Sequence, residues 1–466
     1  MKKGVLFFGL MLVITAKMLI LAGCAGIIPP SGGPRDTIPP KLLVAFPKDS
    51  ATYVKSQKIV LSFDEFVELK DFQQNVLVSP NPVKSPLVDY KLKTITIKLR
   101  DSLEPNTTYS INFGNAIKDI NEGNVFKEFT YTFSTGATLA DGTFSGKVVL
   151  AETGKYDSTL IVVLHNTLHD TAIYKKSPRY LAKVTGQGLF AFKNIAPGKY
   201  NAFVLPNDYS KKYDDSTKLF AFLDSTITIS NTTPPATFYA YEEVKRKEKA
   251  PASNNNKGKD APKEDKRLKY MTSLESNQQD LLTPLTITFN RKLKLLDSSK
   301  ITLCDTFYNP LPDMGIQLDT TSLIATLSYP WKAATDFRLV IEKQAAKDTN
   351  GAYLPKGDTL KFTTRNEADY GSIKVRFKNI DLKKHPVLQI VSNDKIQESV
   401  PLKDAIFKRK LFKPGDYMLR ILLDENQNGV WDTGNFSKRL QPERVLEKTW
   451  KLNVKANWDN EMDISL

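Results

Sequence analysis

Apolar and polar residues alternate one by one in many short runs of this chain, which is the pattern of β-strands with one buried face. The first such runs are Ile59–Phe63, Ile95–Leu99, Tyr109–Phe113 and Phe129–Phe133. Pro, Asn, Asp and Gly separate them, and these residues are typical of turns. Nothing in this region keeps a helical period of apolar residues over three turns. We therefore expect an antiparallel β-sandwich over residues 41–137.

A second group of strand-like runs follows and contains a short turn motif. The runs are Gly146–Leu150, Leu160–Leu164, Leu189–Phe192 and Ala202–Leu205. The motif Pro197-Gly-Lys-Tyr200 comes just before the last run. These features predict another β-sandwich over residues 138–240.

Residues 241–269 break the alternation. From Glu242 to Lys269 the chain has ten Lys or Arg and six Asp or Glu, but only one Val and one Leu. Such a segment buries too little apolar surface to offset the chain entropy lost on folding. We expect a disordered, charged linker that trypsin cuts before the folded parts.

The chain repeats itself after this linker, in the same order. The matching segments are Ile59–Phe63 with Leu285–Phe289, Asp119–Gly123 with Asp348–Gly351, Tyr109 with Phe337, Phe133 with Phe362, and Pro197–Tyr200 with Pro414–Tyr417. Residues 270–366 should therefore be a degenerate copy of the first sandwich, and residues 367–466 a copy of the second. The predicted fold class is all-β, with four tandem sandwiches.

Two family resemblances add to this organisation. The first sandwich resembles the SbsA-type bacterial Ig-like domain through Asp36–Pro40, Ile59–Phe63, Leu103–Tyr109 and Phe133–Gly136. That resemblance implies that Tyr109 forms a tyrosine corner, although a plain buried aromatic remains the alternative. The Phe-x-Phe strand followed by Pro-Gly-x-Tyr resembles the prealbumin-like sandwiches of surface proteins and carboxypeptidase regulatory modules. The repeats extend both resemblances to the second half.

The first 24 residues have the features of an export signal. Lys2 and Lys3 precede a short apolar stretch, and Leu21-Ala-Gly-Cys24 follows it. Lys17 interrupts the apolar stretch, which makes a membrane-spanning helix unfavourable. The four residues resemble a bacterial lipobox, which implies cleavage of residues 1–23 and lipidation of Cys24. Residues 24–40 are rich in Pro and Gly and should form an extended tether.

The charge of the chain limits the classes of partner that it fits, and its cysteine content limits disulfide formation. The chain has a formal charge of +15, and removal of the three lysines before Cys24 leaves +12. A basic chain often binds nucleic acid, but an exported protein rarely meets it, so we expect no nucleic-acid partner. Anionic glycans, lipid headgroups or envelope proteins fit better, and a purely solubilising role stays open. Once Cys24 is lipidated, Cys304 has no cysteine left to pair with.

The sequence has no nucleophile elbow, phosphate-binding glycine loop or cysteine-rich metal pattern, and we expect no enzyme. Asp followed by Ser or Thr and then Ala, Ile, Leu or Thr resembles the O-glycosylation pattern of Bacteroidetes secreted proteins. The acidic residues of these motifs are Asp36, Asp49, Asp101, Asp157, Asp170, Asp215, Asp224, Asp319 and Asp358. The same residues also favour turns, because their side chains bond to the local backbone. Both interpretations remain open.

One loop carries a candidate metal site. Oxygen-bearing side chains occupy the first, third, fifth and ninth places of the segment 424–432, with Gly429 at the sixth. We expect Asp424, Asn426, Asn428, Asp432 and the carbonyl of Val430 to bind Ca²⁺ weakly. A metal-free Asn-Gly hairpin turn is the alternative. The corresponding loop of the first copy has Tyr209 and Lys211 at the third and fifth places, which offer no suitable oxygen ligand, and it should bind no calcium.

The expected function is that of a non-enzymatic lipoprotein of the bacterial cell envelope, anchored at the outer membrane through its lipid. Sandwiches of these types usually serve as structural spacers or protein-interaction modules. The alternative is a surface lipoprotein that binds glycans or peptides through loops of the last sandwich. Three tryptophans lie there, Trp431, Trp450 and Trp458. Exposed rings would stack on sugars, whereas buried ones would only fill the core.

Overall fold

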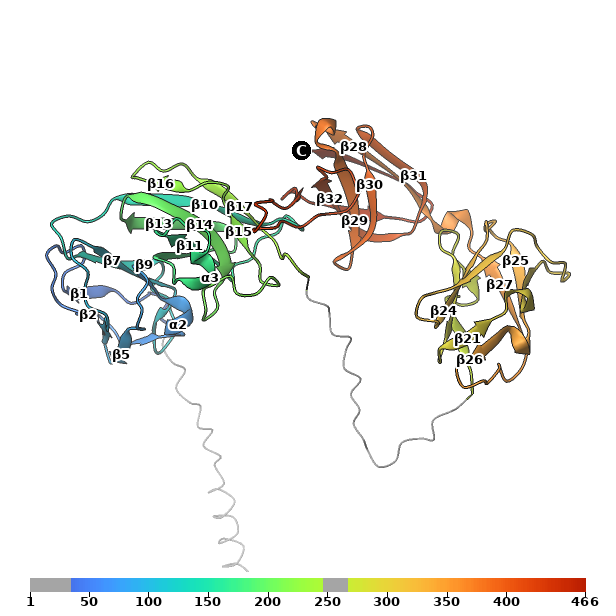
Figure 1. Ribbon diagram of the computed structural model, residues 1–466, viewed down its shortest axis with the longest axis horizontal. Helices are drawn as coiled ribbons and strands as arrows, with labels where there is room; N and C mark the ends of the chain where they lie inside the picture. The colour runs from blue at the N-terminus through green and yellow to red at the C-terminus, as the bar shows by residue number, and fades with distance from the viewer. Residues whose placement is uncertain (1–34, 246–266) are drawn as a thin grey trace, which may run out of the picture. The chain divides into compact units, whose positions relative to one another are not determined.

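The computed structural model describes residues 35–245 and 267–466. Short strands dominate it, and the helices within the described residues have three or four residues each (Figure 1). The predicted all-β fold of tandem β-sandwiches is confirmed. By internal contacts the chain divides into two compact units, one extending to Asp141 together with Asn194–Ala196, and one with the remaining residues. Cys24, the signal segment, most of the tether and residues 246–266 lie outside the described residues.

The first sandwich contains the alternating runs that the sequence indicates. Its elements are β1 (Leu42–Phe46), β2 (Lys58–Phe63), β3 (Val67–Leu69), α2 (Phe72–Asn75), β4 (Leu77–Ser79), β5 (Leu87–Lys91), β6 (Thr94–Lys98), β7 (Thr108–Gly114), β8 (Ile117–Asp119) and β9 (Phe129–Ser134). The sheets have the orders β1-β2-β6-β5 and β4-β7-β9, and β3 pairs with β8. Ile59, Leu61 and Phe63 of β2 are fully buried between them, as the period of two predicts.

Tyr109 forms the expected tyrosine corner. The backbone N–H of Glu104 donates to the Tyr109 hydroxyl at 2.8 Å. The ring stacks on its cross-strand neighbour Phe133, with 5.1 Å between ring centroids. In the second copy Phe337 stacks on its cross-strand neighbour Phe362 at 5.7 Å. The repeat therefore keeps the ring stack, although phenylalanine has no hydroxyl to make the corner bond.

The second sandwich pairs two strands in parallel. Its elements are β10 (Gly142–Leu150), β11 (Leu160–His165), α3 (Ala172–Lys175), β12 (Tyr180–Lys183), β13 (Leu189–Ile195), β14 (Gly198–Pro206), β15 (Ala221–Phe222), β16 (Ile227–Ile229) and β17 (Ala236–Ala240). One sheet has the order β13-β10-β17, in which β10 and β17 run parallel. The other has the order β12-β11-β14-β15, and β16 also pairs with β14.

The third sandwich repeats the first. Its elements are β18 (Tyr270–Thr272), β19 (Gln278–Gln279), β20 (Leu285–Phe289), β21 (Leu293–Leu296), η1 (Ser298–Lys300), β22 (Ile301–Cys304), β23 (Gly315–Leu318), β24 (Ile324–Ser328), β25 (Asp336–Ile341), η2 (Lys343–Ala345), β26 (Ala346–Asp348) and β27 (Asp358–Thr364). The sheets have the orders β18-β20-β24-β23 and β19-β27-β25-β22, and β21 pairs with β26. Cys304 is a buried free thiol here.

The fourth sandwich repeats the second strand for strand. Its elements are η3 (Glu367–Asp369), β28 (Gly371–Lys378), η4 (Leu382–Lys384), β29 (Pro386–Ser392), β30 (Lys395–Pro401), β31 (Ile406–Phe412), β32 (Gly415–Leu423), β33 (Arg444–Val445), β34 (Trp450–Val454) and β35 (Asp459–Ser465). The sheets have the orders β31-β28-β35, with β28 and β35 parallel, and β30-β29-β32-β33, with β34 on β32. In the described residues of the whole chain, no helix is long and apolar enough to span a membrane.

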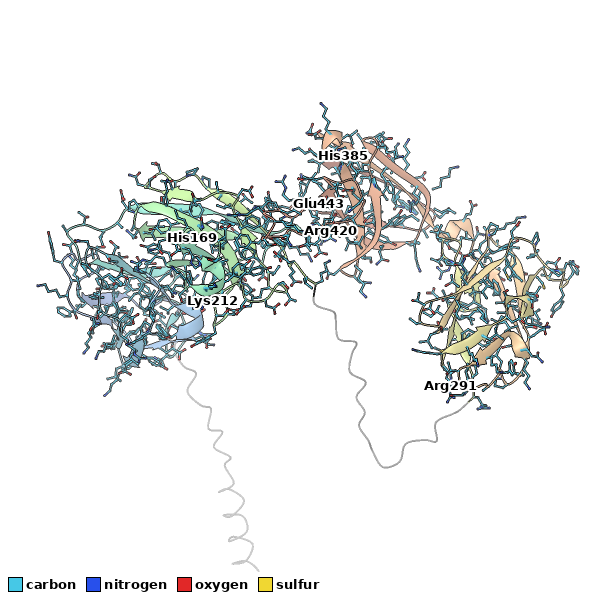
Figure 2. The ribbon with its side chains drawn as sticks, in the orientation of Figure 1. His169, Lys212, Arg291, His385, Arg420 and Glu443 are labelled. Carbon is cyan, nitrogen blue, oxygen red and sulfur yellow. The ribbon has the colours of Figure 1, made fainter. Side chains whose placement is uncertain are left out.

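A buried aspartate closes the same turn in the first and third sandwiches. Asp119, at the end of β8, accepts the backbone N–H groups of residues 122–124 at 2.6, 2.9 and 2.7 Å. Asp348, at the end of β26, accepts those of Asn350 and Ala352 at 2.9 and 2.7 Å. The guanidinium of Arg291, which Figure 2 labels, lies 3.6 Å from the second oxygen of Asp348. The repeated Asp-x-Asn motif is therefore a structural feature of the turn.

Both ends of the expected linker are packed into folded structure. Tyr241 is 1% exposed and pairs with Phe220, and Leu268 is fully buried in the core of the third sandwich. Most of the segment for which the sequence predicts disorder, residues 246–266, lies outside the described residues, so disorder there stays a prediction.

Candidate functional site

The loop that follows β32 is organised around the carboxylate of Asp424. This side chain is 1% exposed. One oxygen accepts the backbone N–H groups of Gln427 and Asn428 at 2.7 and 3.2 Å, and the other accepts that of Gly429 at 2.7 Å. Gly429 has a φ of +81°, a conformation that favours glycine. The carboxylate thus fixes the turn from its inner side.

Asp432 joins the two asparagines of the same loop. The Nδ2 groups of Asn426 and Asn428 both donate to Oδ2 of Asp432 at 2.6 Å. The Oδ1 atom of Asn428 also accepts the backbone N–H of Val430 at 2.8 Å. Four of the five predicted calcium ligands therefore belong to one hydrogen-bond network, because the Asn428 backbone also bonds to Asp424.

Glu443 closes the loop from the far end. Its carboxylate accepts the backbone N–H groups of Glu425 at 2.8 Å and of Asp432 at 3.1 Å. Burial raises the pKa of Glu443 and the nearby Asp424 charge adds to this, although the N–H groups oppose the shift. The Nε1 group of Trp431 donates to the Glu443 carbonyl at 2.7 Å. Glu443 is therefore part of the hydrogen-bonded loop. Its position in the sequence, outside the segment 424–432, gives only a weak indication of this role.

The oxygen atoms of these residues are of the kind that calcium binds. Calcium binding at this loop stays a prediction. In residues 35–245 and 267–466, no group of three or more His, Cys, Asp and Glu side chains is placed to hold a metal. The predicted set depends on two carboxylates, two amides and a carbonyl. The oxygen and nitrogen of an asparagine amide exchange places by a 180° flip, which would turn Oδ1 of Asn426 and Asn428 toward Asp432.

Calcium is expected to stabilise this loop by binding only the folded state. Millimolar CaCl₂ should raise the melting temperature of the mature chain relative to excess chelator, whereas MgCl₂ should not. Asp432→Asn keeps the shape of the side chain and removes one of the two negative ligands, so it should abolish the shift. Identical melting of the unmodified chain in calcium and in chelator would reject the site.

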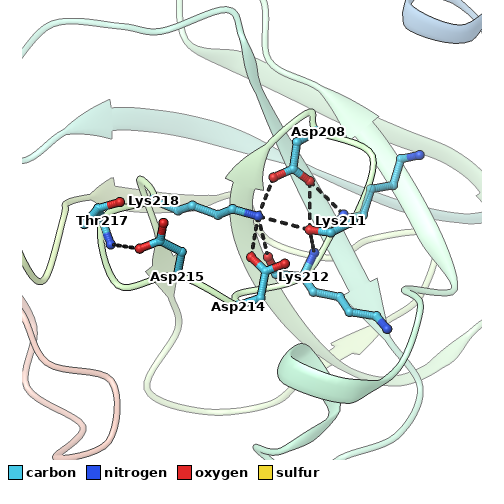
Figure 3. A network of polar contacts seen from close by, with 8 residues as sticks. Asp208, Lys211, Lys212, Asp214, Asp215, Thr217 and Lys218 are labelled. Atoms are coloured by element: carbon cyan, nitrogen blue, oxygen red, sulfur yellow. Dashed lines mark hydrogen bonds and ion pairs between the residues drawn. The ribbon is translucent and has the colours of Figure 1, made fainter. Parts of the chain in front are cut away.

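In the corresponding loop of the first copy, a lysine side chain supplies a positive charge. The ammonium of Lys218 forms ion pairs with Asp208 and Asp214 and donates to Ser210 and to the Lys212 carbonyl at 3.0 and 3.3 Å (Figure 3). Burial opposes the charge of Lys218, but the two carboxylates raise its pKa above the ordinary value. An internal ammonium occupies this oxygen-lined position, which gives a structural reason to expect no calcium in the first copy.

The loop of the second copy is longer, and its extra length reaches the second sandwich. The connection from β14 to β15 spans residues 207–220, whereas that from β32 to β33 spans residues 424–443, which is six residues longer. We call residues 433–443 the arm. Phe436 of the arm is 3% exposed and packs on aromatic rings of the second sandwich. Its ring centroid lies 5.0 Å from Phe222, 5.1 Å from Phe220, 5.7 Å from Phe203 and 6.0 Å from Tyr174.

Hydrogen bonds hold the arm on both sides of Phe436. The Thr433 hydroxyl donates to the Glu242 carbonyl at 2.6 Å, and the Phe436 N–H donates to the Glu243 carboxylate at 2.7 Å. Gln441 donates to the Phe222 carbonyl at 3.2 Å. Glu242 and Glu243 belong to the expected linker, so its first residues are part of this contact.

The contact continues along the backbone beyond the arm. The N–H of Val445 donates to the Ala151 carbonyl at 2.8 Å. A Cβ on Gly154 would lie 2.5 Å from the Leu446 carbonyl oxygen, so only glycine allows this close approach. Glu447 then forms an ion pair with Lys147. The second and fourth sandwiches are therefore joined through packed side chains and direct backbone bonding.

The three tryptophans of the last sandwich do not form one exposed face. Trp431 is half-buried against a small apolar cluster, and Trp450 packs against the core. Trp458 is 63% exposed, with the Lys455 ammonium 5.1 Å from its ring. The structure thus offers a single exposed ring for stacking, and two tryptophans contribute to packing.

Several of the Asp-Ser/Thr motifs take part in turns. The side chains of Asp36, Asp157, Asp215, Asp319 and Asp358 accept backbone N–H groups from residues one to five positions further along. These bonds account for the motif by turn chemistry. Glycosylation at the same positions stays a prediction.

A comparison with protein families matches the first sandwich. Residues 36–135 match the family described as a bacterial Ig-like domain. This match confirms the bacterial Ig-like resemblance of the first sandwich. The match covers less than half of the chain, so it assigns this domain and not the whole protein. A search of curated proteins gives no match.

Solved structures give only distant overlays. The major pilin subunit BcpA of Bacillus cereus aligns at 9% identity over 69% of this chain and 99% of its own, with a TM-score of 0.18. The N-terminal part of the bacterial S-layer protein SbsC aligns at 13% identity over 36% and 40% of the two chains, with a TM-score of 0.16. An L,D-transpeptidase from Mycobacterium smegmatis aligns at 10% identity over 31% and 74%, also at 0.16. At these TM-scores we draw no conclusion from the overlays.

Proposed function

We propose that this protein is a lipid-anchored, non-enzymatic module of the bacterial cell envelope that works as a spacer or a protein-interaction scaffold. The bacterial Ig-like match and the tandem sandwiches fit a structural or interaction module at the cell surface. The anchor is proposed from Leu21-Ala-Gly-Cys24, which resembles a bacterial lipobox, and the Bacteroidetes-type outer-membrane assignment is proposed from the Asp-Ser/Thr pattern.

The observation that carries the spacer role is the contact between the second and fourth sandwiches. A spacer must keep its shape under load, and independent domains on short linkers bend at each linker. Here the arm and the Val445–Ala151 bond cross-link two sandwiches that are far apart in sequence. Such a contact stiffens the chain without a disulfide, which the mature chain lacks the cysteines to form.

The anchor has a direct test. Cys24→Ala should release the protein from the membrane fraction, because no thiol remains to carry the lipid. Mass spectrometry of the unmodified protein should show a lipid-modified Cys24 at the mature N-terminus. Cys304→Ala is the matched control, because that thiol is buried in a sandwich core, and this variant should stay with the membrane. Full membrane retention of the Cys24 variant would contradict the proposal.

A glycan- or peptide-binding role is the second candidate, and one observation favours it. Trp458 presents an exposed ring beside the Lys455 ammonium at a turn of the last sandwich. An aromatic face next to a cation suits acidic sugars or acidic peptides. Trp431 and Trp450 are not available for the same surface, because both pack within the sandwich.

A further inference from the structure

Within the described residues, the buried guanidinium of Arg420 forms no hydrogen bond or ion pair. The residue lies in β32 between Leu419 and Ile421, two core residues, and its own side chain projects from the opposite face of the sheet. The side chain, labelled in Figure 2, is 6% exposed, and within the described residues its Nε group has no hydrogen-bond partner. Burial lowers the pKa of Arg420, and the charges of Glu152 and Asp394 oppose that shift without an ion pair. Buried guanidinium groups are normally paired, because an unpaired one loses its hydration without compensation.

The residue opposite Arg420 on the neighbouring strand also has a buried polar atom without a hydrogen-bond partner among the described residues. Gln389 of β29 lies directly opposite Arg420, is 1% exposed, and its Oε1 atom has no hydrogen-bond partner among the described residues. In the first copy the same two strand positions hold Val163 and Phe203, which pair in the same register. The fold itself therefore accepts an apolar pair at this place. A charged and polar pair here requires another explanation.

The Arg420 side chain lines a cavity of about 950 Å³ between the second and fourth sandwiches, within the range of small-molecule sites. Three carboxylates, from Asp394, Asp416 and Glu447, also line it, and each has its own partner. The partners are Lys155 for Asp394, Asn453 for Asp416, and Lys147 with Tyr156 for Glu447. Among the described lining residues, Arg420 and the exposed Lys451 are the cations that form no hydrogen bond or ion pair. The unpaired charge in the cavity is thus positive.

The remaining lining indicates what kind of anion fits. The three carboxylates would repel a doubly charged phosphate more strongly than a monoanion. The planar guanidinium matches a carboxylate in a two-bond geometry. Ser392, Asn393 and Thr449 add hydroxyl and amide groups, and the ring of Tyr156 adds an apolar face. Hydroxyl groups and flat apolar faces suit a sugar ring better than an aliphatic acid.

We propose that this cavity binds an acidic sugar of the uronic acid class, with its carboxylate on Arg420. The sugar hydroxyls would bond to the polar lining, and Gln389 lies beside the carboxylate position as a second polar group. This site is independent of the proposed anchoring and spacer role, since neither depends on a ligand.

Binding of sodium glucuronate to residues 25–466 tests the proposal by calorimetry. The unmodified protein should bind glucuronate, and Arg420→Met should weaken binding at least tenfold. Arg420→Lys should also weaken it, because it keeps the charge and loses the two-bond geometry. Arg409→Met is the matched control, since that arginine pairs with Glu398 on the sheet surface, and it should leave binding unchanged. Melting of Arg420→Met without ligand should occur at or above the temperature of the unmodified chain, because an unpaired buried charge is removed.

Three comparison ligands make the test specific. Glucose lacks the carboxylate and should not bind, and acetate lacks the sugar ring and should bind at least tenfold more weakly than glucuronate. Inorganic phosphate should also bind more weakly. No glucuronate binding at millimolar concentration, equal binding by Arg420→Met, or equal binding of acetate would overturn the proposal. Tighter binding of phosphate would do so too, as would a clear loss of melting temperature in Arg420→Met.

Discussion

Phe436→Ala is expected to weaken the contact between the second and fourth sandwiches more than any other single change in the arm. The ring is 3% exposed and packs on four aromatic side chains of the second sandwich. Removing a buried phenylalanine costs about 3–5 kcal/mol, because the lost burial adds to the cavity left behind. Hydrogen exchange should then become faster in β14 and β15 and in residues 433–447, whereas the third sandwich should be unaffected.

An exposed phenylalanine provides the control for this change. Phe307 lies in a loop of the third sandwich and is 84% exposed. Phe307→Ala should change stability by less than about 0.5 kcal/mol, as surface substitutions usually do. If Phe436→Ala leaves hydrogen exchange as unchanged as Phe307→Ala does, the arm does not hold the two sandwiches together.

Asp119→Ala is expected to destabilise the first sandwich by about 3–5 kcal/mol. Three N–H groups lose a charged acceptor that contributes about 1.5–3 kcal/mol to each bond. Water recovers part of that sum, because Glu122, Gly123 and Asn124 are exposed or half-buried. Chemical denaturation of the mature chain measures the loss of stability, and hydrogen exchange in β3 and β8 measures where it occurs. Asp119→Asn keeps one oxygen acceptor and should lose less. Asp89→Ala, at an exposed strand position, should change stability little.

Acid should reproduce part of this effect. Burial alone would raise the pKa of Asp119, but the backbone N–H groups lower it by more, so the pKa lies below its ordinary value. The unfolded carboxyl titrates near pH 4, roughly. A depressed pKa in the folded state stabilises the protein above that pH, and the stability is lost as the pH falls through the folded pKa. The first sandwich should therefore lose less stability on acidification in Asp119→Ala than in the unmodified chain, and an unchanged acid response would contradict this role of Asp119.

Much of the architecture follows from short-range patterns in the sequence. The period of two predicts the burial of Ile59, Leu61 and Phe63, because successive side chains of a strand point to opposite faces. The repeat predicts that Phe337 and Phe362 take the places of Tyr109 and Phe133, and both ring stacks are present. These properties depend on neighbours in the same sheet, so local sequence is sufficient to predict them.

The residues that join the two halves could not be predicted in this way. Phe436 is a single apolar residue in a polar loop, and the only sign of its role is the six extra residues relative to the first copy. Arg420 alternates with Leu419 and Ile421, so its outward direction was predictable. The sandwich that covers that outward face belongs to the other half of the chain, and strand periodicity carries no signal for such a contact.

The central claim, that the second and fourth sandwiches form one body, has a direct test by size-exclusion chromatography of a cleaved chain. Cleavage at a specific protease site inserted between Asn254 and Asn255 would break the covalent link between the two halves after purification. We expect the two fragments to elute together at the volume of the uncleaved protein, and to elute apart when Phe436→Ala is added. Separate elution of the two fragments from the otherwise unmodified chain would contradict the account.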